Sequence, residues 1–319
     1  MSDEIEIIKH PYIKFLNLFV VELTYRSPHF HHDYELLLVL SGSATLFCQG
    51  MSFIVEPSDM VLLNPNDTHE IRTTGESLTT LCMQFSPKFF ENTYPTLKTL
   101  SFDEISLKNI LSQEQLHTIR CLLLETSYQY MKRKPTWQLL SSSLLGLLVS
   151  TLLKQIPWHP YTHEEVHKNR LRRKRIENII QYVEDNYASK ILLADIAKKE
   201  GVSTGYLSHF IKDNLNQSFQ EYVTSVRFRH ALLFIRSNLS LLDICLETGF
   251  SNTRYLTNAF IKYQGCTPKE YLAMTDHLVE SKAKAATAEH IYSPSETLTL
   301  LEQLRNKEDI YTTIVALLS

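Results

Sequence analysis

Two groups of side chains, spaced as on one helix face, could contact base edges and phosphates of a DNA duplex. One group is Gly205, Ser208, His209 and Lys212, with offsets of three, four and seven residues, and the other is Arg254, Thr257 and Asn258, with offsets of three and four. Arginine and asparagine bind guanine and adenine edges through paired hydrogen bonds. Lysines such as Lys212 and Lys262 suit phosphates.

The two groups belong to two copies of one motif. Ala197 corresponds to Cys245, and Gly201 corresponds to Gly249, both 48 residues further along the chain. In a helix-turn-helix unit, two helices cross at a tight turn, which needs a small residue at the crossing. The glycine four residues later supplies the positive φ of the turn. The repeat therefore predicts two helix-turn-helix units.

Capping residues support this prediction over a generic helical bundle. Ser203 and Ser251 are the expected N-caps of the second helix in each unit. Each copy also ends in a capping box that starts the next helix, with Ser218 and Thr267 as the caps. The charge pattern agrees, because residues 168–275 carry 16 basic and 10 acidic side chains, whereas residues 1–167 carry 12 and 18. A basic segment in an otherwise acidic chain is typical of contact with a polyanion.

The same residues resemble the DNA-binding domain of AraC/XylS-type transcription regulators. The matching stretches are IAKKEGVSTGYLSHFIKD, SFQEYV, RFRHALLFIRSNLSLLDICLETGFSNTRYLTNAFIKY and TPKEYL. The resemblance implies a seven-helix domain with two DNA-reading helices. The DNA-contacting residues expected here are Ser203, Thr204, Gly205, Ser208, His209, Lys212, Asn252, Thr253, Arg254, Thr257, Asn258 and Lys262. The first helix offers no Arg or Gln to the bases, and Ile261 stands where a basic residue is usual. The first unit is therefore expected to read shape and phosphates.

The resemblance also implies a function. It predicts a sequence-specific transcription regulator, more often an activator than a repressor, that binds double-stranded promoter DNA and RNA polymerase. It further predicts a cytoplasmic homodimer without catalytic residues that responds to a small-molecule effector. Two alternatives stay open at this point: a metal-dependent enzyme tethered to DNA, and a regulator controlled by a protein partner.

A second set of residues lies near the N-terminus and could bind a metal ion or a small molecule. His29, His31, Glu35 and His69 resemble the two ligand motifs of cupin barrels. Alternate residues of a strand point to one side, so a metal site is geometrically possible. We expect instead a metal-free effector pocket without a cofactor; a purely structural role is the other alternative. The expected polar anchors of the pocket are Tyr25, His31, Glu35 and His69.

The elements that must position these residues follow from the hydrophobic pattern. Short apolar runs separated by turn residues over 12–90 predict strands of a barrel, and helical periodicity begins near residue 103. The fold class is therefore α+β and multidomain. The expected parts are a cupin-like barrel (1–100), two helices (101–156), a linker (157–170), an all-α double helix-turn-helix domain (171–275) and a helical C-terminal extension (276–319).

The second helix of segment 101–156 has two interpretations. Its leucines cover one face, and Ser142, Ser143, Gly146 and Ser150 form a small-residue face, so it either covers the barrel or forms a dimer interface. The uncharged stretch 135–153 is too polar for a confident membrane span, and no membrane partner is expected. The five cysteines have no metal-finger spacing, which favours reduced structural thiols and no metal.

Overall fold

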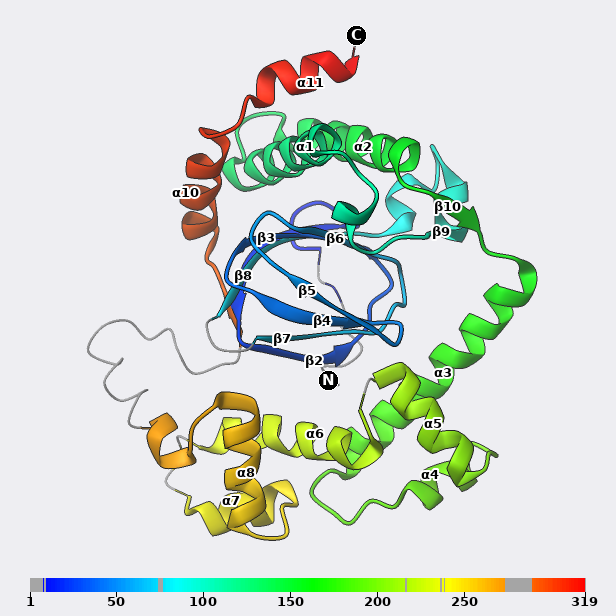
Figure 1. The fold of residues 1–319 in the computed structure, drawn as a ribbon, viewed down its shortest axis with the longest axis vertical. Helices are drawn as coiled ribbons and strands as arrows, with labels where there is room; N and C mark the ends of the chain where they lie inside the picture. Colours follow the sequence, from blue (N-terminus) through cyan, green and yellow to red (C-terminus); the bar gives the residue numbers. More distant parts are fainter. Residues whose placement is uncertain are drawn as a thin grey trace.

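The computed structural model describes residues 10–73, 77–215, 217–235, 239–272 and 289–318, together with residues 8 and 237. A β-barrel occupies the centre, helices cover one side of it, and a helical domain lies on the opposite side (Figure 1). The predicted order of barrel, helices and helix-turn-helix domain is confirmed.

Two antiparallel sheets form the barrel. One has the strand order β11-β1-β8-β3-β6, and the other has the order β2-β7-β4-β5. The strands of the N-terminal region are β1 (Leu16–Leu23), β2 (Tyr25–His29), β3 (Tyr34–Ser41), β4 (Ala44–Cys48), β5 (Met51–Val55), β6 (Met60–Leu63), β7 (His69–Thr73) and β8 (Leu78–Phe85).

Strand β3 shows why the larger sheet is apolar on both faces. Leu36 and Leu38 pack in the core shared with the covering helices, whereas Leu37 and Val39 pack in the barrel interior. Successive side chains of a strand point to opposite faces, so a strand buried on both sides is hydrophobic throughout.

Two long helices cover the larger sheet. They are α1 (Gln113–Lys132) and α2 (Trp137–Gln155), and α1 begins with a capping box formed by Ser112 and Gln115. Between β8 and α1 lie three short 3₁₀ helices and one strand: η1 (Pro87–Phe90), η2 (Pro95–Thr99), β9 (Leu100–Phe102) and η3 (Leu107–Asn109). Among the described residues, α2 alone has the length and composition to cross a membrane; its Leu145 and Leu148 are buried in the core shared with the barrel.

The prediction of an irregular linker over residues 157–170 is wrong. Residues Trp158–Pro160 form strand β10, which pairs with β9, and α3 (His163–Asn186) begins only three residues later. Thr162 caps this helix and Glu165 completes the capping box. The helix that leads into the predicted domain 171–275 therefore begins at residue 163, within the predicted linker.

The helix-turn-helix domain begins with α3, whose Ile176, Ile180 and Val183 pack in the core of the first unit. The labelled helices that follow are α4 (Leu193–Lys199), α5 (Thr204–Leu215), α6 (Phe219–Phe234), α7 (Leu241–Thr248) and α8 (Thr253–Gln264). The first unit has its own core around Ile211 and Tyr222, and the second has a separate core around Leu256 and Phe260. The predicted capping boxes at Ser218 and Thr267 are both present.

The C-terminal extension returns to the barrel (Figure 1). Its elements are β11 (Glu289–Ile291), α10 (Pro294–Arg305) and α11 (Ile310–Leu318), and residues 276–288 of the predicted extension lie outside the described residues. Strand β11 pairs with β1, and α10 and α11 pack on α1. The extension is thus not purely helical, and it packs on the barrel and its covering helix α1.

Candidate functional site

The first helix-turn-helix unit consists of α4 and α5. Ala197 is buried where the two helices meet, and Gly201 adopts a φ of +66° in the turn. The backbone N–H of Tyr206 donates to Ser203 Oγ (3.1 Å), so Ser203 is the predicted N-cap of α5. The local signals in the sequence therefore position the first reading helix.

The second unit consists of α7 and α8. Gly249 has a φ of +76°, and a Cβ there would lie 2.4 Å from the carbonyl oxygen of Tyr187. Glycine is therefore required at position 249 for two reasons: the positive φ of the backbone and the close approach of the chain at the end of α3. The N-cap of α8 is Asn252, whose Oδ1 accepts from the N–H of Tyr255, so the prediction of Ser251 as this cap is wrong by one residue.

The side chains predicted to contact DNA lie on the outer surfaces of the two units. Thr253 and Thr257 are half-buried, and the exposed ones are Ser203, Thr204, Gly205, Ser208, His209, Lys212, Asn252, Arg254, Asn258 and Lys262. Leu207 and Leu256, on the inward faces of the same two helices, are fully buried. Both surfaces are therefore accessible in the chain as it stands, which is what contact with a duplex requires.

One basic contact near the first reading helix was not predicted. The Arg175 guanidinium lies over the ring of Tyr206 at 5.4 Å, and its Nη1 donates to the Tyr206 hydroxyl (3.0 Å). Tyr206 itself is half exposed, and Tyr255 at the corresponding position of the second unit is also exposed. Arg175 belongs to a run of basic residues within α3, but the sequence did not indicate that Tyr206 is its partner.

The barrel contains a cavity of about 320 Å³ that is partly open to solvent. Most of its wall is apolar and comes from β1, β3, β7, β8 and β11. Polar groups gather at one part of the wall, and they are Asn17, Arg26, His29, Glu35, His69, Thr80 and Gln84. A largely apolar cavity with a few converging polar groups is the usual form of a small-molecule site.

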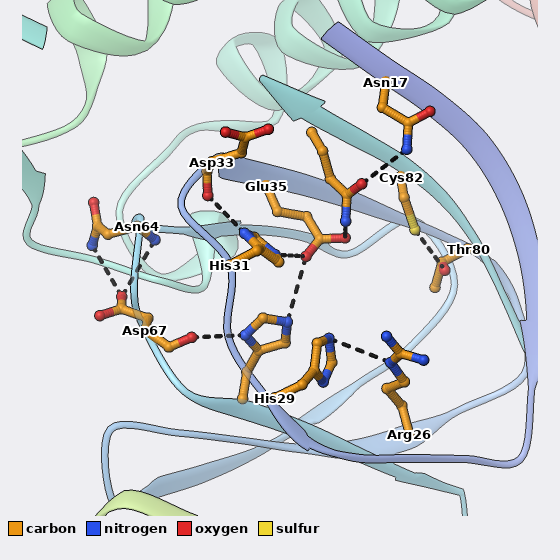
Figure 2. Close-up of polar contacts among 12 residues, drawn as sticks. Asn17, Arg26, His29, His31, Asp33, Glu35, Asn64, Asp67, Thr80 and Cys82 are labelled. Atoms are coloured by element: carbon orange, nitrogen blue, oxygen red, sulfur yellow. Dashed lines mark hydrogen bonds and ion pairs between the residues drawn. The ribbon is translucent and has the colours of Figure 1, made fainter. Parts of the chain in front are cut away.

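Glu35 is the centre of the polar wall (Figure 2). Its Oε2 accepts from His31 Nε2 (2.7 Å) and lies 3.4 Å from His69 Nε2, and its Oε1 accepts from Gln84. Burial raises the pKa of the Glu35 carboxyl, but the hydrogen bonds from His31 and His69 outweigh burial and hold it well below its ordinary value. The cavity therefore contains a carboxylate that is ionised at neutral pH.

Arg26 provides the opposite charge at the same wall. Figure 2 shows its side chain beside His29, and Arg26 Nε donates to His29 Nε2 at 3.4 Å. The other ring nitrogen, His29 Nδ1, lies 2.8 Å from the carbonyl oxygen of Ser27 and therefore carries the proton. Burial lowers the pKa of His29 well below its ordinary value, so this imidazole is neutral.

Three of these side chains could hold a metal ion. Donor atoms of His31, Glu35 and His69 all lie within 4.8 Å of one another, and all three residues are buried. The fourth residue of the cupin-like motif, His29, uses its Nε2 to accept from Arg26 instead. Because this nitrogen is engaged with Arg26, the cupin-like set lacks its fourth ligand, which favours the metal-free use of the cavity that the sequence predicted.

The predicted effector anchors divide into three kinds. Glu35 and His69 line the cavity, and His31 stands behind Glu35 and fixes its carboxylate. The placement of Tyr25 in the pocket is wrong, because its ring lies against Tyr263 of α8. Sequence reasoning missed several residues that line the cavity. Arg26 directly follows Tyr25 on β2, and Ile291 comes from the C-terminal extension. Asn17 of β1 and Gln84 of β8 face each other on paired strands.

Strand β2 therefore faces two ways. Arg26 and His29 point into the cavity, whereas Tyr25 packs on the core of the second helix-turn-helix unit. Phe30, the residue after the strand, is buried in the core of the first unit, at 1% exposure. Residues 25–30 thus place two cavity residues between two contacts to the DNA-binding domain.

Comparisons with known proteins agree with this arrangement. Residues 21–149 match the model of the AraC-like ligand binding domain, and residues 196–274 match that of a helix-turn-helix domain. A Staphylococcus aureus (strain MRSA252) HTH-type transcriptional regulator is 23% identical over 265 residues, which are 82% of this chain and 34% of that protein. The chain thus spans about a third of the length of such relatives.

Other relatives are closer in length. The HTH-type transcriptional regulator YbfI of Bacillus subtilis is 22% identical over 233 residues, covering 72% of this chain and 80% of that protein. Among solved structures, ToxT from Vibrio cholerae is 16% identical and covers 82% of this chain and 99% of its own, with a TM-score of 0.42. From the two domain matches and their order, this chain is a member of the AraC family of transcription regulators, with a ligand-binding domain followed by a helix-turn-helix DNA-binding domain.

Proposed function

We propose that this protein regulates transcription by binding promoter DNA with both reading helices, and that a small molecule in the barrel cavity controls this binding. The observation that carries the proposal is the double role of β2. Its cavity residues Arg26 and His29 lie between Tyr25 and Phe30, which contact the two helix-turn-helix cores. A ligand that moves this strand changes how the two units are held.

The cavity supports a ligand with a polar and an apolar part. Arg26 and the Glu35 carboxylate offer opposite charges, and the amides of Asn17 and Gln84 offer further hydrogen bonds. The remaining wall, formed by residues such as Phe19 and Ile291, is apolar. Such a cavity favours a small molecule with hydrogen-bonding groups at one end.

The DNA-binding half supports contact with two successive major grooves. Helix α6 joins the two units and has 16 residues, which corresponds to roughly 24 Å of α-helix. Reading helices separated by one turn of DNA, about 34 Å, enter grooves on one face of the duplex. Base readout is assigned mainly to Arg254 and Asn258, and phosphate contact to Lys212 and Lys262.

The finer parts of the function are also proposals. AraC/XylS-type regulators commonly activate, which supports activation through RNA polymerase in the cytoplasm rather than repression. Leu139 and Leu140 on α2 are exposed, and Ser143 and Ser150 continue the exposed face, which supports a homodimer through this helix. Sedimentation of the full chain tests this, with Leu139→Glu expected to give monomers and Leu246→Glu, in the other domain, expected to leave the dimer intact.

Binding-site selection with the full chain tests the central proposal. We expect one preferred sequence with two half-sites about one helical turn apart, and an affinity that falls steeply with salt because phosphate contacts release counterions. Absence of salt-sensitive binding to any duplex contradicts the proposal. A screen of small metabolites for an increase in Tm then identifies the cavity ligand.

The second candidate function is a metal-dependent enzyme tethered to DNA. The convergence of His31, Glu35 and His69 is the observation in its favour. Metal analysis of the purified chain distinguishes the two functions. A stoichiometric metal that is lost in Glu35→Gln supports the enzyme, whereas effector-dependent DNA binding by metal-free protein supports the regulator.

A further inference from the structure

A cluster of metal-ligand side chains joins the C-terminal extension to the sensor, far from the cavity wall described above. His117 and Cys121 stand four residues apart on α1, so both project from the same face of that helix. Glu308 lies in the turn between α10 and α11 and approaches them from the extension. The cluster therefore brings together two segments almost 190 residues apart in sequence.

The distances within the cluster are short. His117 Nδ1 lies 3.1 Å from Glu308 Oε2, and Cys121 Sγ lies 3.5 Å from His117 Nε2. One donor atom from each of the three side chains can be chosen so that all lie within 4.8 Å of one another. In a tetrahedral zinc site with bonds of about 2.0–2.3 Å, neighbouring ligand atoms are roughly 3.3–3.8 Å apart. The two short contacts use different ring nitrogens of His117, and one ion binds only one of them, so side-chain rotation must bring the third donor from within 4.8 Å to this distance.

The surroundings of the cluster resemble a supported metal site. Cys121 is fully buried, whereas the side chains of His117 and Glu308 are 35% and 18% exposed, so an ion can enter from the solvent side. Arg120 Nη1 lies 3.6 Å from Glu308 Oε1, the carboxylate oxygen that points away from His117. The Thr313 hydroxyl lies 3.3 Å from His117 Nε2. Outer contacts of this kind orient ligands around a bound metal.

We propose that His117, Cys121 and Glu308 bind one zinc ion, with a water molecule as the fourth ligand. Nitrogen, thiolate sulfur and carboxylate oxygen are the ligands that zinc takes in proteins, and the sulfur disfavours magnesium and calcium. Binding releases the thiol proton of Cys121 to solvent and forms the zinc–sulfur bond without any change of oxidation state.

The ion would fasten the extension to the sensor. Outside the cluster, the ion pairs Arg305–Glu125 and Lys132–Glu302 also connect them. The same extension contributes Ile291 to the cavity wall through β11. A metal at the α10–α11 turn therefore stabilises the segment that closes one side of the cavity. This inference does not depend on DNA binding.

Titration of the reduced, metal-free full chain with Co²⁺ tests the site. A cobalt ion bound to a thiolate gives a sulfur-to-metal charge-transfer band in the near ultraviolet, and we expect one band at one equivalent. Zn²⁺ should abolish the band by competition. Cys121→Ser should remove it, whereas the matched control Cys48→Ser, which alters a buried thiol of β4, should retain it.

Glu308→Gln provides a variant that keeps the thiol in place if Cys121→Ser does not fold. We expect it to weaken Co²⁺ binding at least about tenfold and to abolish the increase in Tm that Zn²⁺ causes in the wild type. Absence of a sulfur band in the wild type, or a band that survives Cys121→Ser, overturns the proposal. Cobalt bound without a sulfur band also overturns it, because His31, Glu35 and His69 offer no thiolate.

Discussion

The aromatic rings of Tyr25 and Tyr263 lie 5.2 Å apart, centroid to centroid, at an interplanar angle of 36°. Tyr25 belongs to the sensor strand β2, and Tyr263 belongs to the second reading helix, α8. Both rings are part of one apolar cluster with Phe228. Strand β2 of the barrel therefore packs directly on helix α8 of the second helix-turn-helix unit.

Tyr25→Ala should loosen this contact. Aromatic pairs contribute about 0.5–1.5 kcal/mol beyond the area they bury, so we expect the free energy of unfolding to fall by ~1–2 kcal/mol. Hydrogen exchange should increase in α8 as well as in β2. Tyr311→Ala, which removes a ring that is 81% exposed, is the control and should change stability by less than about 0.5 kcal/mol. Unchanged exchange in α8 would show that the contact does not hold the two domains together.

Arg254→Ala should weaken binding to the selected duplex by ~1–3 kcal/mol and relax the preference at one base pair. The reason is the loss of a bidentate contact to a base edge. Competition binding against single-base variants of the site measures both effects. Lys269→Ala removes an exposed cation outside the reading helices and should leave the base preference intact. An unchanged preference in Arg254→Ala would exclude this residue from base readout.

The two turn glycines should respond differently to alanine. Gly201→Ala meets no atom within 4 Å, so its cost is the positive φ alone, about 1 kcal/mol. Gly249→Ala adds a clash with the backbone of Tyr187 and Ala188 and should cost more than ~3 kcal/mol or prevent folding of the second unit. Urea unfolding of both variants measures the difference. Equal costs would contradict the close approach of α3 to the second turn.

Glu184 should make stability depend on pH. Burial raises the pKa of its carboxyl, but His230 and Arg229 outweigh burial and hold it below its ordinary value. The resulting stability is present above the unfolded pKa of about 4.3 and is lost as the pH falls through the lower folded value. Glu184→Gln should therefore cost about 1–2 kcal/mol at pH 7 and much less at pH 3.

Urea unfolding at both pH values checks this expectation. The exposed Glu247→Gln is the matched control and should change the free energy of unfolding by less than about 0.5 kcal/mol at pH 7. If Glu184→Gln cost the same at pH 7 and pH 3, the contacts with His230 and Arg229 would not be the source of the shift.

The helix-turn-helix units were predictable because their signals are local. A small residue, a glycine and a capping side chain occupy fixed positions within about ten residues, as Ala197, Gly201 and Ser203 do. The exception, Asn252 in place of Ser251, arises because the second turn has one extra residue. Irregular composition after Pro157 obscured α3, although Thr162 and Glu165 formed a readable capping box.

The cavity was less predictable because it depends on strand register and long-range pairing. Neighbouring residues of a strand face opposite sides, so the choice between Tyr25 and Arg26 depends on a register that the hydrophobic pattern did not define. A register shift between Arg26 and His29 further breaks simple alternation. Ile291 reaches the cavity only because β11 pairs with β1 across most of the chain, and no local pattern indicates such a pairing.

The most direct test of the account is the effect of the cavity ligand on DNA affinity when β2 is uncoupled from the reading domain. The compound that raises Tm most should change the Kd for the selected duplex about 5–150-fold in the wild type. In the Tyr25→Ala/Phe30→Leu double variant it should still raise Tm, yet change the Kd less than about twofold. An equal change in Kd in both proteins would contradict the role of β2.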